Sequence, residues 1–167
     1  MSLVTILFCS LIAFSTFLFG ELVAWLTHKY IMHGLLWSWH RSHHTKHSHF
    51  LERNDLFVIV FSTPAIFLFC YATLLSYNPY LIAVAIGMTC YGAFYMAFHD
   101  IIVHQRIRWR IKRKSKYLQR MINAHNVHHS KHGKEGCEAF GFLFASKKYE
   151  ITTFDQQEPT RKNLQTN

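Results

Sequence analysis

The chain has 167 residues, 50% of them hydrophobic, and a formal net charge of +9. This length suits a single domain. Apolar residues gather in long blocks, with the charges between and after them, which is typical of a membrane protein. The basic residues directly follow a hydrophobic span, so cytoplasmic orientation and anionic lipid headgroups explain them better than a nucleic-acid partner.

The first apolar block predicts a transmembrane helix. No charged side chain occurs in Met1–Gly20, Glu21 interrupts the block, and Leu22–Thr27 continues it. At about 1.5 Å per residue this run crosses a hydrocarbon core of roughly 30 Å. A signal peptide is the alternative, but the basic segment and the A-x-A-like cleavage site of such peptides are missing. We expect a retained span.

The second apolar block, Leu56–Phe98, also lacks charge. As one helix it would measure about 64 Å, twice the thickness of a bilayer. Asn78-Pro79 near its middle is a turn signal. We therefore expect two spans, about Leu56–Ser76 and Tyr80–Phe98, joined by a tight hairpin, with a kink at Pro64.

Three spans divide the charges between the two faces of the membrane. One face receives only Met1–Ser2 and the Ser76–Pro79 turn, which carry no charged side chain. The other receives all 18 Lys and Arg residues, and the 13 histidines lie on it or just inside it. By the positive-inside rule that face is cytoplasmic, so we expect an integral membrane protein with its histidines on the cytoplasmic side.

The segment Ile107–Ile122 predicts a helix that lies on the membrane surface. Ile107, Ile111, Leu118 and Ile122 fall within an arc of about 60°, and Lys and Arg fill most of the remainder. Beyond Ser146 the chain is polar and shows no periodicity. We expect a membrane-embedded domain over 1–146 and a loose polar tail over 147–167.

The four cysteines show no sign of chemistry. Cys9, Cys70 and Cys90 lie inside apolar blocks, and none of these or Cys137 forms a CxxC pair. We expect packing residues rather than disulfides or thiolate metal ligands.

Ten histidines form clusters of two kinds that occur twice in the same order. The HxxxxH pairs are His28 with His33 and His99 with His104, and the HxxHH clusters are His40, His43 and His44, then His125, His128 and His129. Imidazole suits Fe, Cu, Zn and Ni. The chain contains no Glu-x-x-His, so it is not a soluble di-iron bundle.

The spacing of the clusters predicts a site for two metal ions. On an α-helix, residues five apart differ by about 140° and 7.5 Å, so we expect each HxxxxH pair to reach two neighbouring ions. Residues three and four apart share a face, so HxxHH directs two imidazoles together and a third aside. For His47, His49 and His132 we expect exposed positions or positions near the site.

Carboxylates near the site are candidate partners for the second N–H of a ligating histidine. Asp100 adjoins His99, and Asp55 begins the second span, where capping the helix is an equally good reading. Glu21 lies at lipid depth, which marks it as functional, although a protonated and hydrogen-bonded role remains open.

The clusters resemble those of the membrane fatty-acid hydroxylase/sterol desaturase superfamily, and within it the β-carotene 3-hydroxylases. The resemblance rests on the segment from His28 to Gly34, on Trp39-His40-Arg41-Ser42-His43-His44, on His99-Asp100 with Val103-His104-Gln105-Arg106, and on His125 to Ala145, which contains HNVHH and GFLFA. It covers roughly Glu21 to Ala145. A carotenoid 4,4′-ketolase resembles the chain less, because its histidine boxes are spaced differently.

The resemblance implies an all-α membrane enzyme that hydroxylates C3 of the β-ionone rings of β-carotene. It implies two iron ions on the ten histidines, replaceable by zinc in a purified sample, with O2 as co-substrate and a ferredoxin-type electron donor. Trp37, Trp39 and Phe142 are candidates for a substrate wall. The alternatives are a lipid or sterol hydroxylase or desaturase, a membrane metal transporter, and a haem-binding electron carrier.

Overall fold

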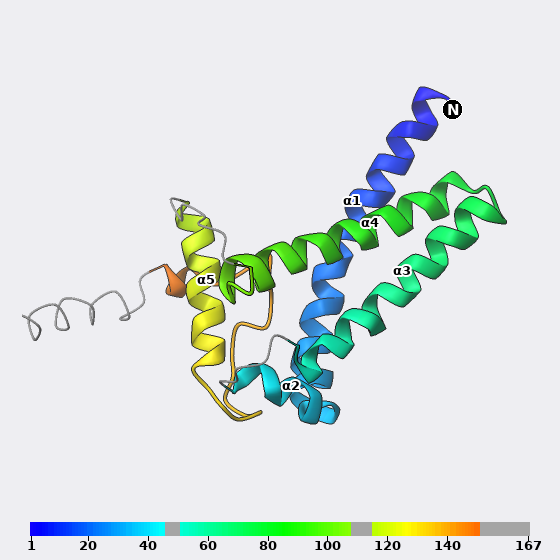
Figure 1. Cartoon of the computed structure of the whole chain (residues 1–167). Helices are drawn as coiled ribbons and strands as arrows, with labels where there is room; N and C mark the ends of the chain where they lie inside the picture. The colour runs from blue at the N-terminus through cyan, green and yellow to red at the C-terminus, as the bar shows by residue number, and fades with distance from the viewer. Residues whose placement is uncertain (46–50, 108–114, 151–167) are drawn as a thin grey trace, which may run out of the picture.

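The computed structural model describes residues 1–45, 51–107 and 115–150, and every regular element within these ranges is a helix. The predicted all-α class is therefore confirmed, and Figure 1 shows the arrangement. The elements are α1 (Leu3–Leu26), η1 (Thr27–Leu35), α2 (Trp37–His44), η2 (Arg53–Asp55), α3 (Leu56–Leu74), α4 (Pro79–Tyr95), η3 (Met96–Val103), α5 (Lys116–His129) and η4 (Lys147–Tyr149).

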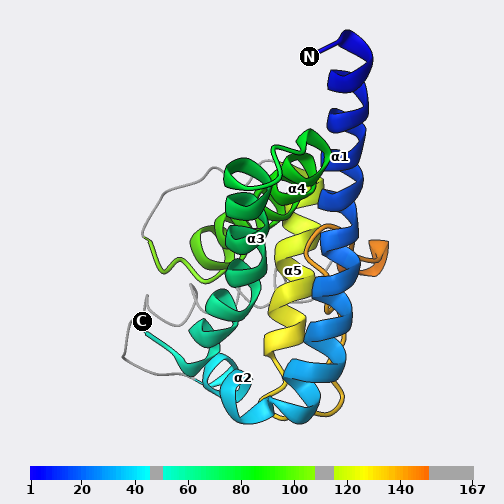
Figure 2. The same ribbon diagram turned by 90° about the vertical axis from the view of Figure 1, so that its right-hand side faces the viewer.

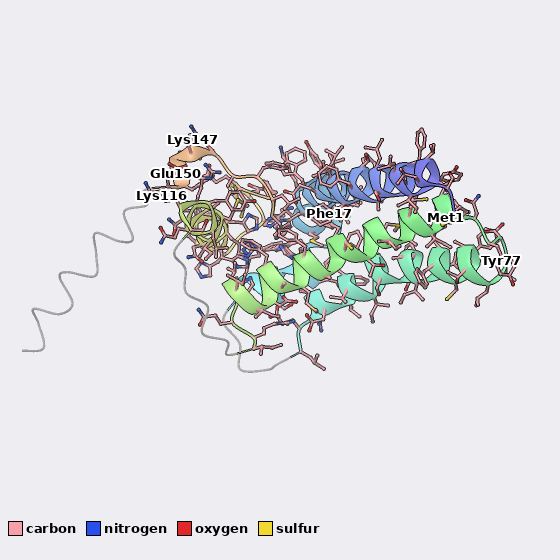
Figure 3. The ribbon with its side chains drawn as sticks, turned by 90° about the horizontal axis from the view of Figure 1, so that it is seen from above. Met1, Phe17, Tyr77, Lys116, Lys147 and Glu150 are labelled. Atoms are coloured by element: carbon pink, nitrogen blue, oxygen red, sulfur yellow. The ribbon has the colours of Figure 1, made fainter. Side chains whose placement is uncertain are left out.

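Three helical stretches are long and apolar enough to cross a membrane, as predicted. They are Leu3–Leu35, Arg53–Leu74 and Pro79–Val103. The first and third run further than expected because the π-helices η1 and η3 continue α1 and α4. In Figure 3, Met1 and Tyr77 lie at one end of these helices, and Lys116, Lys147 and Glu150 lie at the other.

A tight hairpin joins α3 to α4, as the Asn78-Pro79 signal predicted (Figure 1). The side chain of Asn78 accepts a hydrogen bond of 2.9 Å from the backbone N–H of Tyr80 and caps α4. Pro79 occupies the first helical position, where the missing N–H costs nothing. Pro64 lies inside α3, which is one uninterrupted helix, so the kink stays a prediction.

Helix α4 packs against both α1 and α3. Its contact with α1 depends on Gly87, where an added Cβ would lie 2.5 Å from the backbone oxygen of Ala13. Ala83 and Ala85 on α4 are also buried. Small residues let two helices approach closely, which is how helices associate in lipid.

Helix α5 covers only the C-terminal part of the segment predicted as a surface helix. It begins only at Lys116, Ile107 precedes it outside any helix, and 108–114 lie outside the described residues. Met121 and Ile122 on α5 are buried in a core with Phe98 and Phe142. Of the predicted arc, Ile122 is buried and Leu118 packs against the same core, whereas Ile107 is exposed and Ile111 lies outside the described residues.

The first residues of the predicted tail, which begins at residue 147, contact α5. Tyr149 is buried, and its backbone oxygen accepts a hydrogen bond of 3.0 Å from the amide of Asn123 on α5. Arg120 pairs with Glu150 at 2.7 Å. Residues 147–150 are thus attached to α5, and the rest of the predicted tail lies outside the described part of the chain.

Candidate metal centre

The ten clustered histidines meet in two groups of five. In each group every side chain offers one ligand atom, and these atoms lie within 4.8 Å of one another. We name the groups set A and set B. Set A contains His28, His33, His40, His44 and His128, and set B contains His43, His99, His104, His125 and His129.

Both HxxxxH pairs lie on or at the end of a π-helix, and each pair falls within one set. The expectation that the members of a pair reach different ions is therefore wrong. A π-helix closes its hydrogen bonds at i→i+5, so residues five apart stand above one another. The backbone N–H of His104 donates to the oxygen of His99 at 2.9 Å in this way. The α-helical angle used for the prediction does not apply here.

Both HxxHH clusters divide as predicted, with two imidazoles together and the third aside. His40 and His44 belong to set A, whereas His43 belongs to set B. In the second cluster His125 and His129 belong to set B, whereas His128 belongs to set A. Each HxxHH cluster therefore contributes two imidazoles to one set and its third imidazole to the other set.

In seven of these rings, Nδ1 lies within hydrogen-bond distance of an oxygen atom. The Nδ1 acceptors in set A are Phe140 O for His28, Lys134 O for His33, Asn54 Oδ1 for His40, Lys131 O for His44 and Glu138 O for His128, at 2.7–3.2 Å. In set B, Glu52 accepts from His43 and Asp100 accepts from His99. Such oxygens only accept, so Nδ1 carries the proton and the Nε2 lone pair points inward.

These inward lone pairs fit metal ions. The Nε2 atoms of His28 and His40 lie 3.1 Å apart, and those of His104 and His125 lie 3.0 Å apart. Two lone pairs at that distance repel unless a cation lies between them. Burial lowers the pKa of His40 to about 2 and that of His104 to about 4, so protons are poor occupants and the imidazoles are neutral. Neutral imidazole is the form that binds metal.

Two further atoms of set B have unused hydrogen-bonding capacity. His125 Nδ1 and His129 Nε2 are buried and have no hydrogen-bond partner within the described residues. A buried polar atom without a partner costs free energy unless a ligand satisfies it. A metal ion can satisfy His129 Nε2, whereas His125 already turns its Nε2 toward His104 and leaves Nδ1 for a different partner. The imidazoles of both sets suit imidazole-preferring metals such as iron or zinc.

The acidic residues near the site differ partly from the sequence reading. Asp100 accepts the Nδ1–H of His99 at 2.8 Å, whereas Asp55 pairs with Arg106 at 2.7 Å. The carboxylate that holds His43 is Glu52, which also pairs with Arg106. Asp55 does not cap α3 with its side chain either.

Sequence reasoning missed two histidine partners, Glu52 and Asn54. Glu52 was one of the few acidic residues near the clusters, which is the only signal that could have marked it. Asn54 accepts from His40 at 2.7 Å and is buried, but its amide carries no sequence motif.

Glu21 contacts the segment after α5 rather than a histidine. Its carboxylate accepts hydrogen bonds from the backbone N–H groups of Phe142 and Leu143 at 2.8 and 2.9 Å, and from the hydroxyl of Tyr91 at 2.8 Å. Figure 2 shows this segment passing beside α1. The same segment supplies the carbonyl of Phe140 that holds His28. Through Glu21 and its hydrogen bond with Tyr91, α1 and α4 are thereby connected to the segment whose Phe140 carbonyl holds His28 of set A.

The aromatic candidates lie in three different surroundings. Trp37 stands 5.2 Å from the ring of His33, and Trp39 packs on Phe57 at 5.5 Å. Phe142 is buried and stacks on His28 with ring centroids 5.5 Å apart. Their role as a substrate wall stays a prediction. Of the remaining histidines, His132 is exposed, and His47 and His49 lie outside the described residues.

Comparison with known proteins identifies the family of the chain. The profile of the fatty acid hydroxylase family matches residues 13–147. The chain is 43% identical over 136 residues to the beta-carotene hydroxylase of Paracoccus sp., covering 81% of this chain and 83% of that protein. It is 45% identical to the beta-carotene hydroxylase of Pantoea ananas, covering 81% and 77%. With the chloroplastic beta-carotene 3-hydroxylase 1 of Arabidopsis thaliana, identity is 34%, covering 74% of this chain and 40% of that protein.

The chain therefore belongs to the fatty acid hydroxylase family. Within it, the bacterial relatives that match over most of both chains are beta-carotene hydroxylases. No solved structure matches the chain at a significant level.

Proposed function

We propose that the protein hydroxylates C3 of each β-ionone ring of β-carotene, giving β-cryptoxanthin and then zeaxanthin. The observation that carries the proposal is the pair of five-imidazole sets, in a chain 43–45% identical to bacterial beta-carotene hydroxylases. The ten histidines hold two iron ions. O2 is the co-substrate, and a ferredoxin-type protein supplies the electrons.

The protein contributes orientation and a water-poor environment. Two bound irons supply the redox capacity to activate O2 toward an unactivated C–H bond. Backbone and side-chain oxygens keep seven Nε2 atoms turned inward, and eight of the ten imidazoles are buried. No side chain acts as a nucleophile. The apolar spans lead a membrane-dissolved polyene to the site.

In this proposal the protein lies in a bacterial inner membrane, and its metal site is on the cytoplasmic side. Met1 and Tyr77 share one end of the helices, and Lys116 and Lys147 lie at the other (Figure 3). Positive charge gathers on the cytoplasmic side of membrane proteins, where it meets anionic lipid headgroups. A soluble electron donor reaches the site from the same side.

The other candidate functions fit the geometry less well. A metal transporter needs ligands along a path through the bilayer, whereas these imidazoles gather on the π-helical ends of two spans and on the segments that follow. Haem iron takes at most two axial protein ligands, one on each side of a wide planar ring, whereas five imidazoles converge in each set here. A lipid or sterol hydroxylase or desaturase would share the metal site and differ in substrate.

Pigment analysis under 18O2 tests the proposal. The chain is expressed in cells that make β-carotene, and the expected products are β-cryptoxanthin and zeaxanthin labelled at C3. The variant His104→Ala should leave β-carotene unchanged, and His132→Ala should behave as the unsubstituted chain. Label from water, a 4-keto product, or untouched β-carotene beside modified fatty acids would each contradict the assignment.

A further inference from the structure

The two histidine sets differ in the charge of the oxygens that hold them. In set A all five Nδ1–H groups donate to uncharged oxygens, four of them backbone carbonyls and the fifth the amide of Asn54. The carbonyls of Phe140, Lys134, Lys131 and Glu138 belong to the segment after α5. All five imidazoles of set A are therefore held by uncharged hydrogen-bond acceptors.

In set B the two corresponding acceptors are carboxylates. Glu52 Oε2 accepts from His43 at 3.0 Å, and Asp100 Oδ1 accepts from His99 at 2.8 Å. The carboxylate of Glu52 is only 8% exposed, so water screens it little. His43 and His99 themselves contact through their Nε2 atoms at 2.8 Å. The two carboxylates thus hold two neighbouring imidazoles of set B, His43 and His99.

Arg106 lies beside these carboxylates and offsets part of their charge. Its guanidinium pairs with Glu52 at 3.0 Å and with Asp55 at 2.7 Å. Even so, set B has two carboxylates among its hydrogen-bond acceptors, whereas the five acceptors of set A are uncharged.

We propose that the two metal positions are unequal and that set B holds its ion more tightly than set A. A carboxylate that accepts Nδ1–H strengthens the imidazole as a donor to the metal. Its negative charge also attracts the cation directly where the effective dielectric constant is low. The proposal rests on the two-metal centre proposed above and adds an order of affinity to it.

Metal release measures this order without reference to activity. The purified full chain in detergent is loaded with Zn2+ alone, then mixed with excess chelator, and released zinc is followed with time. We expect two phases of equal amplitude, the slow one from set B. Glu52→Gln and Asp100→Asn should each accelerate the slow phase by roughly 10–100-fold, the usual effect of losing such a partner, and leave the fast phase unchanged.

Asn54→Asp is the matched variant for set A. It places a carboxylate on Nδ1 of His40, where the amide oxygen now lies at 2.7 Å, and should slow the fast phase. His132→Ala, on the surface, should change neither phase. Zinc stoichiometry and helical circular dichroism show that each variant has folded.

The possible results separate the two proposals. Two ions per chain leaving in one phase, or Glu52→Gln accelerating the fast phase instead, would overturn the inequality and leave the two-metal centre standing. A folded chain that binds no Zn2+ would overturn both.

Discussion

His43 Nε2 lies 2.8 Å from His99 Nε2, although His40 and His44 of the same HxxHH cluster belong to the other set. His128 makes the reciprocal exchange, with its Nε2 3.1 Å from that of His33. Each half of the chain, a span with its π-helix and the helix that follows, therefore completes the set of the other. Neither set of five can form from one half alone.

The exchanged histidines should matter as much as the unexchanged ones. His43→Ala and His128→Ala should each remove most activity and lower the bound metal toward one ion per chain, because each deletes one of five ligands from a set. Hydroxylation in β-carotene-producing cells and metal analysis of purified protein measure this, with His132→Ala as control. Full activity in both variants would contradict the ligand assignment.

Removing the metals should destabilise the protein. The Nε2 lone pairs that converge at about 3 Å repel one another without a cation, and an ion bound only by the folded state stabilises it by mass action. Treatment with chelator should lower the melting temperature in detergent, and added Zn2+ should restore it. An unchanged melting temperature would mean that the sets do not bind metal in the folded chain.

Glu21 should stabilise the segment that supports set A. Glu21→Ala leaves the buried N–H of Phe142 and that of Leu143 without their acceptor, at a cost of about 1–3 kcal/mol each. Thermal unfolding should show a larger loss than Tyr91→Phe, which removes one hydroxyl partner of the carboxylate. Metal content should fall in Glu21→Ala as well. Equal melting temperatures for the two variants would refute this role.

The close approach of α1 and α4 should tolerate no side chain at Gly87. In Gly87→Ala the new Cβ would meet the backbone oxygen of Ala13 at 2.5 Å, and backbone cannot move aside cheaply. We expect a loss of about 1–3 kcal/mol by denaturation in detergent. Gly92→Ala on the same helix is the control, because nothing lies within 4 Å of its added Cβ. Equal stability of the two would show that the helices separate easily.

The α3–α4 turn should face away from the cytoplasm. In a chain without its own cysteines, Asn78→Cys should react with a membrane-impermeant thiol reagent from outside the inner membrane. Lys147→Cys should react only after the membrane is opened, because it lies at the opposite end in Figure 3. Labelling of position 78 only from the cytoplasm would exclude the proposed orientation.

Local signals predicted the spans and the metal-binding residue types. The uncharged blocks and the Asn78-Pro79 turn depend on short stretches of chain, and the structure confirms the three spans and the hairpin. The division of HxxHH into two imidazoles and one also follows from helical geometry within a single cluster. The sequence by itself determined these features because hydrophobic length and residue spacing act over one helix.

Only the tertiary structure decided which imidazoles meet and what holds them. The π-helical winding reversed the expected division of each HxxxxH pair, and Glu52 took the place that Asp55 was expected to fill. His28 donates to the carbonyl of Phe140, 112 positions along the chain. Backbone carbonyls have no residue signature, and contacts between distant segments depend on how whole helices pack, so neither could be read from spacing.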